Sequence, residues 1–226
     1  MPAMDLLIDT IAKKIAQYHG VVKTGRTHLM DAMPLTIDQE LGAWNTQLLN
    51  ARASLITVLD ALRFLPQGGT AVGTGINAHP RFAREFCKAI SPLVGFKAET
   101  SNDYFRNLSS QDLSVQLSGE LKNLAVILMK ISNDLRWMNS GPLAGIAEVE
   151  LQALQPGSSI MPGKVNPVIP EAVAMAGADV IGNDVTVTVA AQSGSFQLNV
   201  MMPVIAYCNL KSCLLYTSDA ADDCWS

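Results

Sequence analysis

The chain has 226 residues, which is enough to bury a core and to form one or two domains. Its net charge of −4 offers no basic stripe for phosphates, so we expect no nucleic-acid partner. Its four cysteines lack CxxC spacing, no charged start precedes an apolar signal segment, and no uncharged apolar run is long enough for a bilayer. These features predict a soluble cytoplasmic protein without a membrane partner. Because 49% of the residues are hydrophobic and only 16% charged, we expect partner subunits to cover much of the surface.

Helical spacing dominates the first quarter of the chain. Apolar residues predict a short amphipathic helix over residues 4–18, followed by a polar loop over 21–34. Thr36 and Gln39 have the spacing of a capping box, and a leucine-rich pattern then continues to Pro66. A helix of this length is typical of a long bundle.

The next segment, residues 67–77, is rich in glycine. Thr74 stands where a P-loop requires lysine, and the GxGxxG fingerprint is absent, which excludes nucleotide binding. The segment is either a tight loop whose backbone N–H groups face something polar or a plain connection between helices. A short helix is predicted over 81–89, stopping before Pro92, and residues 96–107 are expected to be irregular.

The second half again predicts helices. Leucine and isoleucine step by three and four from Leu121 to Met138, which indicates a helix with a coiled-coil-like core face, stopped by Gly141 and Pro142. Further helices are expected over 170–192 and from within 196–210. Since no hairpin or βαβ signal is found, the predicted fold is all-α, a bundle of long helices.

The last residues break this pattern. Residues 214–226 are acidic, lack a helical stripe, and resemble translated sequencing-adapter read-through. We therefore predict one helical-bundle domain over residues 1–212 and a non-native tail over 213–226.

Two polar stretches stand out against the apolar scaffold, residues 25–34 and 156–171. Together they supply an imidazole, a carboxylate, a hydroxyl and an ammonium, from His28, Glu171, Ser158 and Lys164. These groups suit the removal of a proton next to a carboxylate, which places a second negative charge on that carboxylate. Lys164, Asn166 and the N-terminus of the helix near Pro170 would stabilise that charge.

The sequence GSSIMPGKVNP (157–167) resembles the signature of the fumarase/aspartase superfamily, in a form close to class II fumarases. GRTHLMDAMPLTIDQE (25–40) resembles the second conserved region of those enzymes, and the likeness continues to about Leu210. The resemblance implies the reversible anti addition of water to fumarate, giving L-malate, as in the tricarboxylic acid cycle. It also implies a homotetramer with a shared central helical bundle.

The resemblance also implies roles for individual residues. Ser158 matches the serine of the mobile signature loop, which is the favoured base for the C3 proton. His28 is expected to pair with Glu171 and to handle the water or its proton. Whether Ser158 or His28 is the base stays open. Substrate contacts are implied for Thr27, Ser159, Lys164 and Asn166.

Other interpretations remain. Aspartate ammonia-lyases carry glutamine at the position of His28, so the histidine favours a hydratase; an assay of malate against aspartate separates the two. A second alternative is a non-catalytic helical protein. For His28 itself, the alternative is a structural histidine whose ring is satisfied by backbone groups. His19, His28 and His79 lie in separate segments, so neither a metal nor a nucleotide or redox cofactor is implied.

The first conserved region of the family, with its Ser-Ser-Asn, and the small C-terminal domain are absent from the sequence. Family active sites draw residues from three subunits. We therefore expect the chain alone to have little or no hydratase activity.

Overall fold

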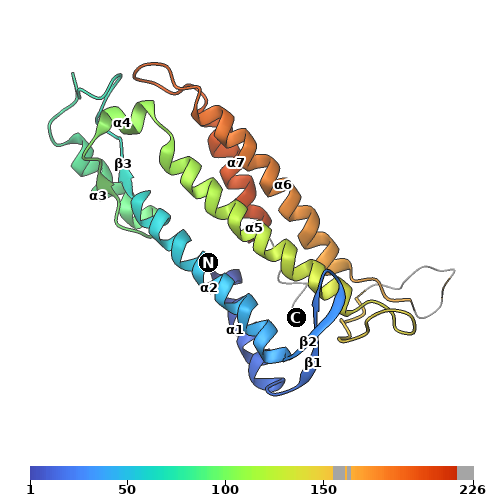
Figure 1. Cartoon of the computed structure of the whole chain (residues 1–226). Helices are drawn as coiled ribbons and strands as arrows, with labels where there is room; N and C mark the ends of the chain where they lie inside the picture. Colours follow the sequence, from blue (N-terminus) through green and yellow to red (C-terminus); the bar gives the residue numbers. More distant parts are fainter. Residues whose placement is uncertain (155–160, 162–163, 218–226) are drawn as a thin grey trace. The chain divides into compact units, whose positions relative to one another are not determined.

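The computed structural model describes residues 1–154, 161 and 164–217 (Figure 1). This part is mainly helical, which confirms the predicted fold class, and it contains seven helices and four short strands. The helices are α1 (Pro2–Gln17), α2 (Ile37–Ala61), α3 (Phe82–Val94), α4 (Tyr104–Ser109), α5 (Asp112–Met138), α6 (Val168–Ala191) and α7 (Met202–Leu215). The strands are β1 (Val22–Thr27), β2 (Met30–Thr36), β3 (Phe64–Leu65) and β4 (Glu99–Thr100).

The chain divides into two compact units, each described here by itself. Unit 1 comprises Met1–Ala53, Asn123–Ala178 and the residues from Tyr216. Unit 2 comprises Ser54–Lys122 and Asp179–Leu215. The predicted domain boundary at residue 212 stays a prediction; α7 continues to Leu215, and residues 218–226 lie outside the described residues.

Apolar faces of α1, α2 and α5 form the core of unit 1. The apolar spacing predicted for α5 is confirmed here, because Leu124, Ile131 and Met138 are buried. α6 approaches α5 closely at Gly177, where a Cβ atom would lie 2.6 Å from Met129 Cγ. The other buried hydrophobic residues of unit 1 are Met4, Ile8, Ile11, Trp44, Leu48, Ala51, Ala125 and Ile127.

A β-hairpin occupies the segment predicted to be a polar loop. β1 and β2 pair antiparallel, so the expectation of a fold without hairpins is wrong. The register shifts between Thr24 and Arg26, where Gly25 alone faces two residues of β2, Ala32 and Met33, which marks a β-bulge in β2. A Cβ atom on Gly25 would lie 2.4 Å from the Met33 carbonyl oxygen, so the position opposite the bulge requires glycine.

The N-terminus of α2 holds the base of the hairpin. Asp38 accepts hydrogen bonds from the Gly20 amide, at 3.1 Å, and contacts His19 Nδ1 at 3.0 Å. The Thr36 amide donates to Gln39 Oε1 over 3.1 Å, which is the reach-back half of the predicted capping box. α2 ends at Ala61 rather than continuing to Pro66, because Phe64 and Leu65 form β3.

Unit 2 contains two further corrections. β3 pairs parallel with β4, and α4 follows, so residues 96–107 are more regular than predicted. α3 includes Pro92 and ends at Val94, before Gly95 in a left-handed conformation. Pro92 lies in the last turn, where it cannot donate to the Lys88 carbonyl, and the helix ends two residues later.

The glycine-rich loop bonds to itself. The Gly73 and Gly75 amides both donate to the Gly69 carbonyl, over 2.9 Å and 3.0 Å. Of the two alternatives for residues 67–77, this pattern favours the plain connection between helices. It does not favour a loop that presents its N–H groups to a ligand.

α6 and α7 provide the core of unit 2, where Val187, Ala190, Ile205 and Cys208 form one cluster. Residues 186–189 are all β-branched threonine or valine, and they are helical, as predicted from their context. Among the described helices, α6 is long and apolar enough to cross a membrane by length and composition, a property that core helices of soluble proteins share. Several of its apolar side chains and those of α7 are exposed: Met175, Val185, Val189, Tyr207, Leu210 and Leu214.

Candidate functional site

Two clefts lie in unit 1, and the predicted site residues are divided between them. The first cleft has a volume of about 890 Å³ and includes Lys164, Asn166 and Glu171 in its lining. The second has about 810 Å³ and includes Thr27 and His28. One group of predicted site residues therefore lies beside the end of α5 and the start of α6. The other group lies on the hairpin.

In the first cleft, two predicted ligands precede a helix directly. Lys164 and Asn166 are exposed, and α6 begins at Val168, whose amide donates to the Asn166 carbonyl over 2.9 Å. An ammonium, a side-chain amide and the positive end of a helix dipole all favour an anion. This arrangement can hold a carboxylate.

Glu171 lies in the first turn of α6, and its carboxylate is 3.9 Å from Arg136 on α5. Both side chains are half-exposed, so the pair contributes less than about 1 kcal/mol to stability. Arg136 also donates to Asn133 one turn earlier, over 3.2 Å. The sequence analysis missed Arg136; its spacing from Asn133 on one helix face was the available signal.

His28 lies at the tip of the hairpin. Its φ of 55° and that of Leu29, 62°, form the two-residue turn between Thr27 and Met30. Thr27 and His28 are exposed, and the imidazole makes no hydrogen bond to the residues that the structure describes. The alternative of a structural histidine satisfied by the backbone is therefore not supported.

The expected pairing of His28 with Glu171 is not present within one chain, since the two residues line different clefts. The resemblance implies that they meet across chains, and that pairing stays a prediction. Ser158 and Ser159 lie outside the described residues, so their predicted roles stay predictions as well.

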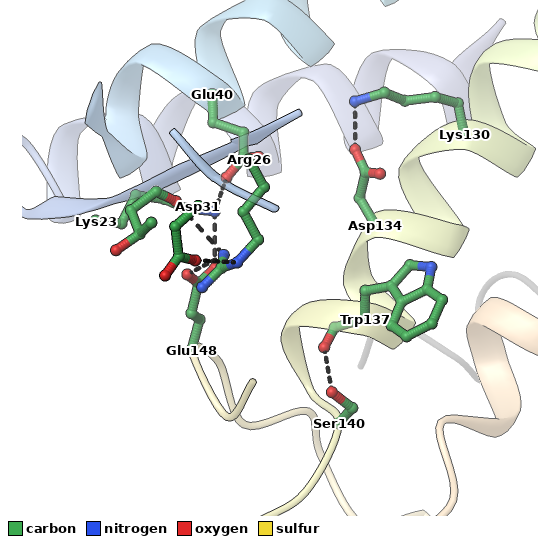
Figure 2. A network of polar contacts seen from close by, with 10 residues as sticks. Lys23, Arg26, Asp31, Glu40, Lys130, Asp134, Trp137, Ser140 and Glu148 are labelled. Carbon is green, nitrogen blue, oxygen red and sulfur yellow. Dashed lines mark hydrogen bonds and ion pairs between the residues drawn. The ribbon is translucent and has the colours of Figure 1, made fainter. Parts of the chain in front are cut away.

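A network of ion pairs connects the hairpin to its surroundings (Figure 2). Lys23 Nζ lies 2.5 Å from Glu40 on α2 and 2.8 Å from Glu148, which follows α5. Arg26 Nη1 lies 2.5 Å from the other carboxylate oxygen of Glu148, and Arg26 Nε lies 3.8 Å from Asp31. The side chains of Lys23 and Glu148 are only 8% and 15% exposed, so water screens the contact weakly.

The network changes the acidity of its members. Burial alone would raise the pKa of Glu148, but the hydrogen bonds and charges of Lys23 and Arg26 outweigh it and lower that pKa. Burial likewise opposes the charge of Lys23, and the carboxylates of Glu148 and Glu40 still raise its pKa. Glu148 and Lys23 are therefore both ionised at neutral pH. The sequence analysis placed Arg26 within a polar loop over residues 21–34 without a role, and it missed Lys23, Glu40 and Glu148.

The second cleft is bounded on α5 by Lys130, Asp134 and Trp137. Lys130 pairs with Asp134 one turn along (Figure 2). Lys130 Nζ also lies 5.6 Å from the centre of the Trp44 ring. Over residues 1–154, 161 and 164–217, no three His, Cys, Asp or Glu side chains gather as metal ligands.

Comparisons with known proteins identify the family of the chain. A family model described as a lyase matches residues 1–182. Fumarate hydratase class II 2 of Pseudomonas aeruginosa is 60% identical over 206 residues, which cover 91% of this chain and 45% of that protein. Fumarate hydratase class II of Xylella fastidiosa (strain Temecula1) is 59% identical over 215 residues, which cover 95% of this chain and 46% of that protein. The chain therefore spans a little under half the length of these relatives.

Solved structures give the same result. The crystal structure of recombinant class II fumarase from Schistosoma mansoni matches with a TM-score of 0.94 and 36% identity, covering 99% of this chain and 50% of that one. The fumarate lyase:delta crystallin from Brucella melitensis, bound to cobalt, matches with a TM-score of 0.92 and 42% identity, covering 99% and 49%. The chain thus belongs to the lyase family and, as its motifs indicated, is similar to class II fumarate hydratases.

Proposed function

We propose that this chain is part of a hydro-lyase that interconverts fumarate and L-malate in the cytoplasm. One observation carries the proposal: Lys164 and Asn166 lie together in a cleft, immediately before the N-terminus of α6, in a chain of the lyase family. The names of the relatives support fumarate as the substrate. The relatives are about twice as long as this chain, and the additional residues would supply the rest of such a site.

The chemistry follows from charge. Removing the C3 proton of malate leaves an electron pair that delocalises into the neighbouring carboxylate, which then carries two negative charges. The Lys164 ammonium, the Asn166 amide and the α6 N-terminus would stabilise it, one such donor being worth about 3–4 kcal/mol. Loss of the C2 hydroxyl, which takes up a proton and leaves as water, completes fumarate. We assign the C3 proton to Ser158 and the water to His28 with Glu171.

The backbone at His28 supports a functional role for its imidazole. Glycine and asparagine adopt a left-handed conformation more easily than histidine, so the turn alone does not explain this residue. A strained residue that also exposes an imidazole into a cleft is an indication of function.

We further propose a homotetramer in the full-length protein. The exposed apolar side chains of α6 and α7 support it, since such faces are usually buried in an assembly. Assembly would also let His28 of one chain meet Glu171 and the cleft of another. By the same reasoning, the chain alone should have little or no hydratase activity.

A chimaera tests the proposal. Residues 1–212 replace the matching part of the Pseudomonas aeruginosa relative, which supplies the remaining length. We expect hydration of fumarate and dehydration of malate, with no turnover of aspartate. Lys164→Met should lower kcat/KM at least about a hundredfold, because it removes one charged donor. Lys88→Met is the matched control, since Lys88 is exposed on α3 and makes no ion pair in the described part of the chain.

The variant His28→Gln separates a fumarate hydratase from an aspartate ammonia-lyase. In a hydratase it should abolish malate turnover without creating activity on aspartate. A folded, tetrameric chimaera that converts aspartate and ignores fumarate would contradict the proposal, and one that converts neither would favour a non-catalytic helical protein.

A further inference from the structure

The ion-pair network occupies a particular place between the two clefts. Glu148 lines the first cleft, while Lys23, Arg26 and Glu40 line the second, beside Thr27 and His28. A single carboxylate thus joins the hairpin that carries His28 to the segment beside the cleft of Lys164, Asn166 and Glu171.

The backbone of Glu148 is itself fixed. Its amide donates to the Met138 carbonyl, the last residue of α5, over 2.8 Å, and the Val149 amide donates to the same oxygen over 3.2 Å. The neighbouring Ala147 amide donates to the Ser140 carbonyl over 2.8 Å, and the Leu151 amide to Asn139 Oδ1 over 2.9 Å. These bonds satisfy the free carbonyl groups at the C-terminus of α5. The Glu148 carboxylate therefore projects from a rigid support.

The hairpin is shaped to reach this carboxylate. In a regular strand, residues three apart point to opposite faces. Lys23 and Arg26 flank Gly25, the place where the bulge of β2 interrupts the regular ladder, and both side chains reach Glu148. Lys23 and Arg26 then take one oxygen each of Glu148, at 2.8 Å and 2.5 Å (Figure 2).

The tip of the hairpin depends on this contact for its place. The base is held by Asp38 and by the Ile37 amide, which donates to the Val21 carbonyl over 2.9 Å. Beyond the base, every residue of β2 from Met30 to Pro34 is exposed, so little packing holds the tip. Arg26, two residues before His28, is the ionic contact of β1 nearest to the turn.

We propose that the Lys23–Glu148–Arg26 network is a positioning device, which sets the place of the Thr27–His28 turn relative to the end of α5. Glu148 is a positioning residue here, since it acts on His28 through the hairpin. That this placement serves catalysis rests on the proposed function, whereas the placement itself does not.

Hydrogen exchange of the 226-residue chain, read by mass spectrometry, tests the placement without measuring turnover. In Glu148→Gln, amides of residues 22–36 should exchange roughly tenfold faster, while those of α1 and of unit 2 keep their rates. Glu148→Asp, which keeps the charge on a shorter side chain, should restore part of the protection. Glu150→Gln is the matched control, because it removes the same charge two residues along from an exposed side chain.

The imidazole signals of His28 in a nitrogen–proton NMR spectrum provide a second measurement. They should shift in Glu148→Gln and stay in place in Glu150→Gln. If Glu148→Gln does not fold, Arg26→Gln removes the same contact from the hairpin side, and the same local pattern is expected. Unchanged hairpin exchange in a folded variant, or equal acceleration throughout unit 1, would overturn the proposal. Loss of hydratase activity in the chimaera would leave both measurements unaffected.

Discussion

Replacing Gly25 by alanine tests the bulge on which the hairpin depends. The added methyl group would meet the Met33 carbonyl oxygen at 2.4 Å and Leu35 Cδ2 at 2.9 Å, so the two strands must separate by about 1 Å at this point. Overpacking of this kind costs about 1–3 kcal/mol. Displacing Arg26 from Glu148 adds to the loss, and we expect the free energy of unfolding of unit 1 to fall by about 2–4 kcal/mol.

Tryptophan fluorescence in urea measures this change, because Trp44 and Trp137 both lie in unit 1. The free energy is obtained by linear extrapolation at one fixed protein concentration. Gly42→Ala is the matched control: Gly42 lies within α2 and nothing comes within 4 Å of its added Cβ. Since alanine favours a helix over glycine, the control should gain about 0.5–1 kcal/mol. A Gly25→Ala chain as stable as the parent, with the control behaving as expected, would refute the reasoning.

Four further changes give distinct outcomes. Asp184→Ala removes a buried carboxylate that accepts from Ser118 Oγ over 2.7 Å and Lys122 Nζ over 2.6 Å, so urea unfolding should show a loss of about 2–4 kcal/mol. Asp179→Ala, whose pair with Lys211 is half-exposed, should cost under about 1 kcal/mol, and equal losses would contradict the role of burial. Asn199→Ala should cost about 3 kcal/mol in the same measurement, because fully buried Asn199 donates to the Ala190 and Ala191 carbonyls and accepts from the Met201 amide. Glu148 has a folded pKa below its ordinary 4.5, so its contribution is complete above pH 4.5 and is lost as pH falls through the folded pKa. The parent should therefore lose more stability than Glu148→Gln between neutral pH and about pH 3, and parallel curves would contradict this.

The long helices were predictable because their burial follows a period that the sequence displays. Leu124, Ile131 and Met138 recur at helical spacing and are buried, as expected. Boundaries are harder to predict, because the sequence places the ends of two helices at Pro66 and before Pro92. The structure accommodates Pro92 in a last turn, and ends α2 earlier in favour of a two-residue strand.

The hairpin could not be found by the same means. Its β2 strand is exposed on both faces up to Pro34, so no alternation of apolar and polar residues marks it. Its turn uses histidine and leucine in a conformation for which Asn-Gly or Asp-Gly is the usual signal.

The candidate site also has a part that the sequence predicts and a part that it does not. The family motif gave Lys164, Asn166 and Glu171, and the structure brings them to one cleft. The partnership of Arg26 with Glu148 spans 122 positions, so no local pattern predicts it.

The uncovered apolar side chains of α6 and α7 have a practical consequence for every measurement in solution. Val185, Val189, Tyr207 and Leu210 favour self-association, so dilution will draw protomers away from any assembly by mass action. Denaturation midpoints should then rise with protein concentration, and a dilution series ahead of mutant comparison would separate the free energy of folding from that of association.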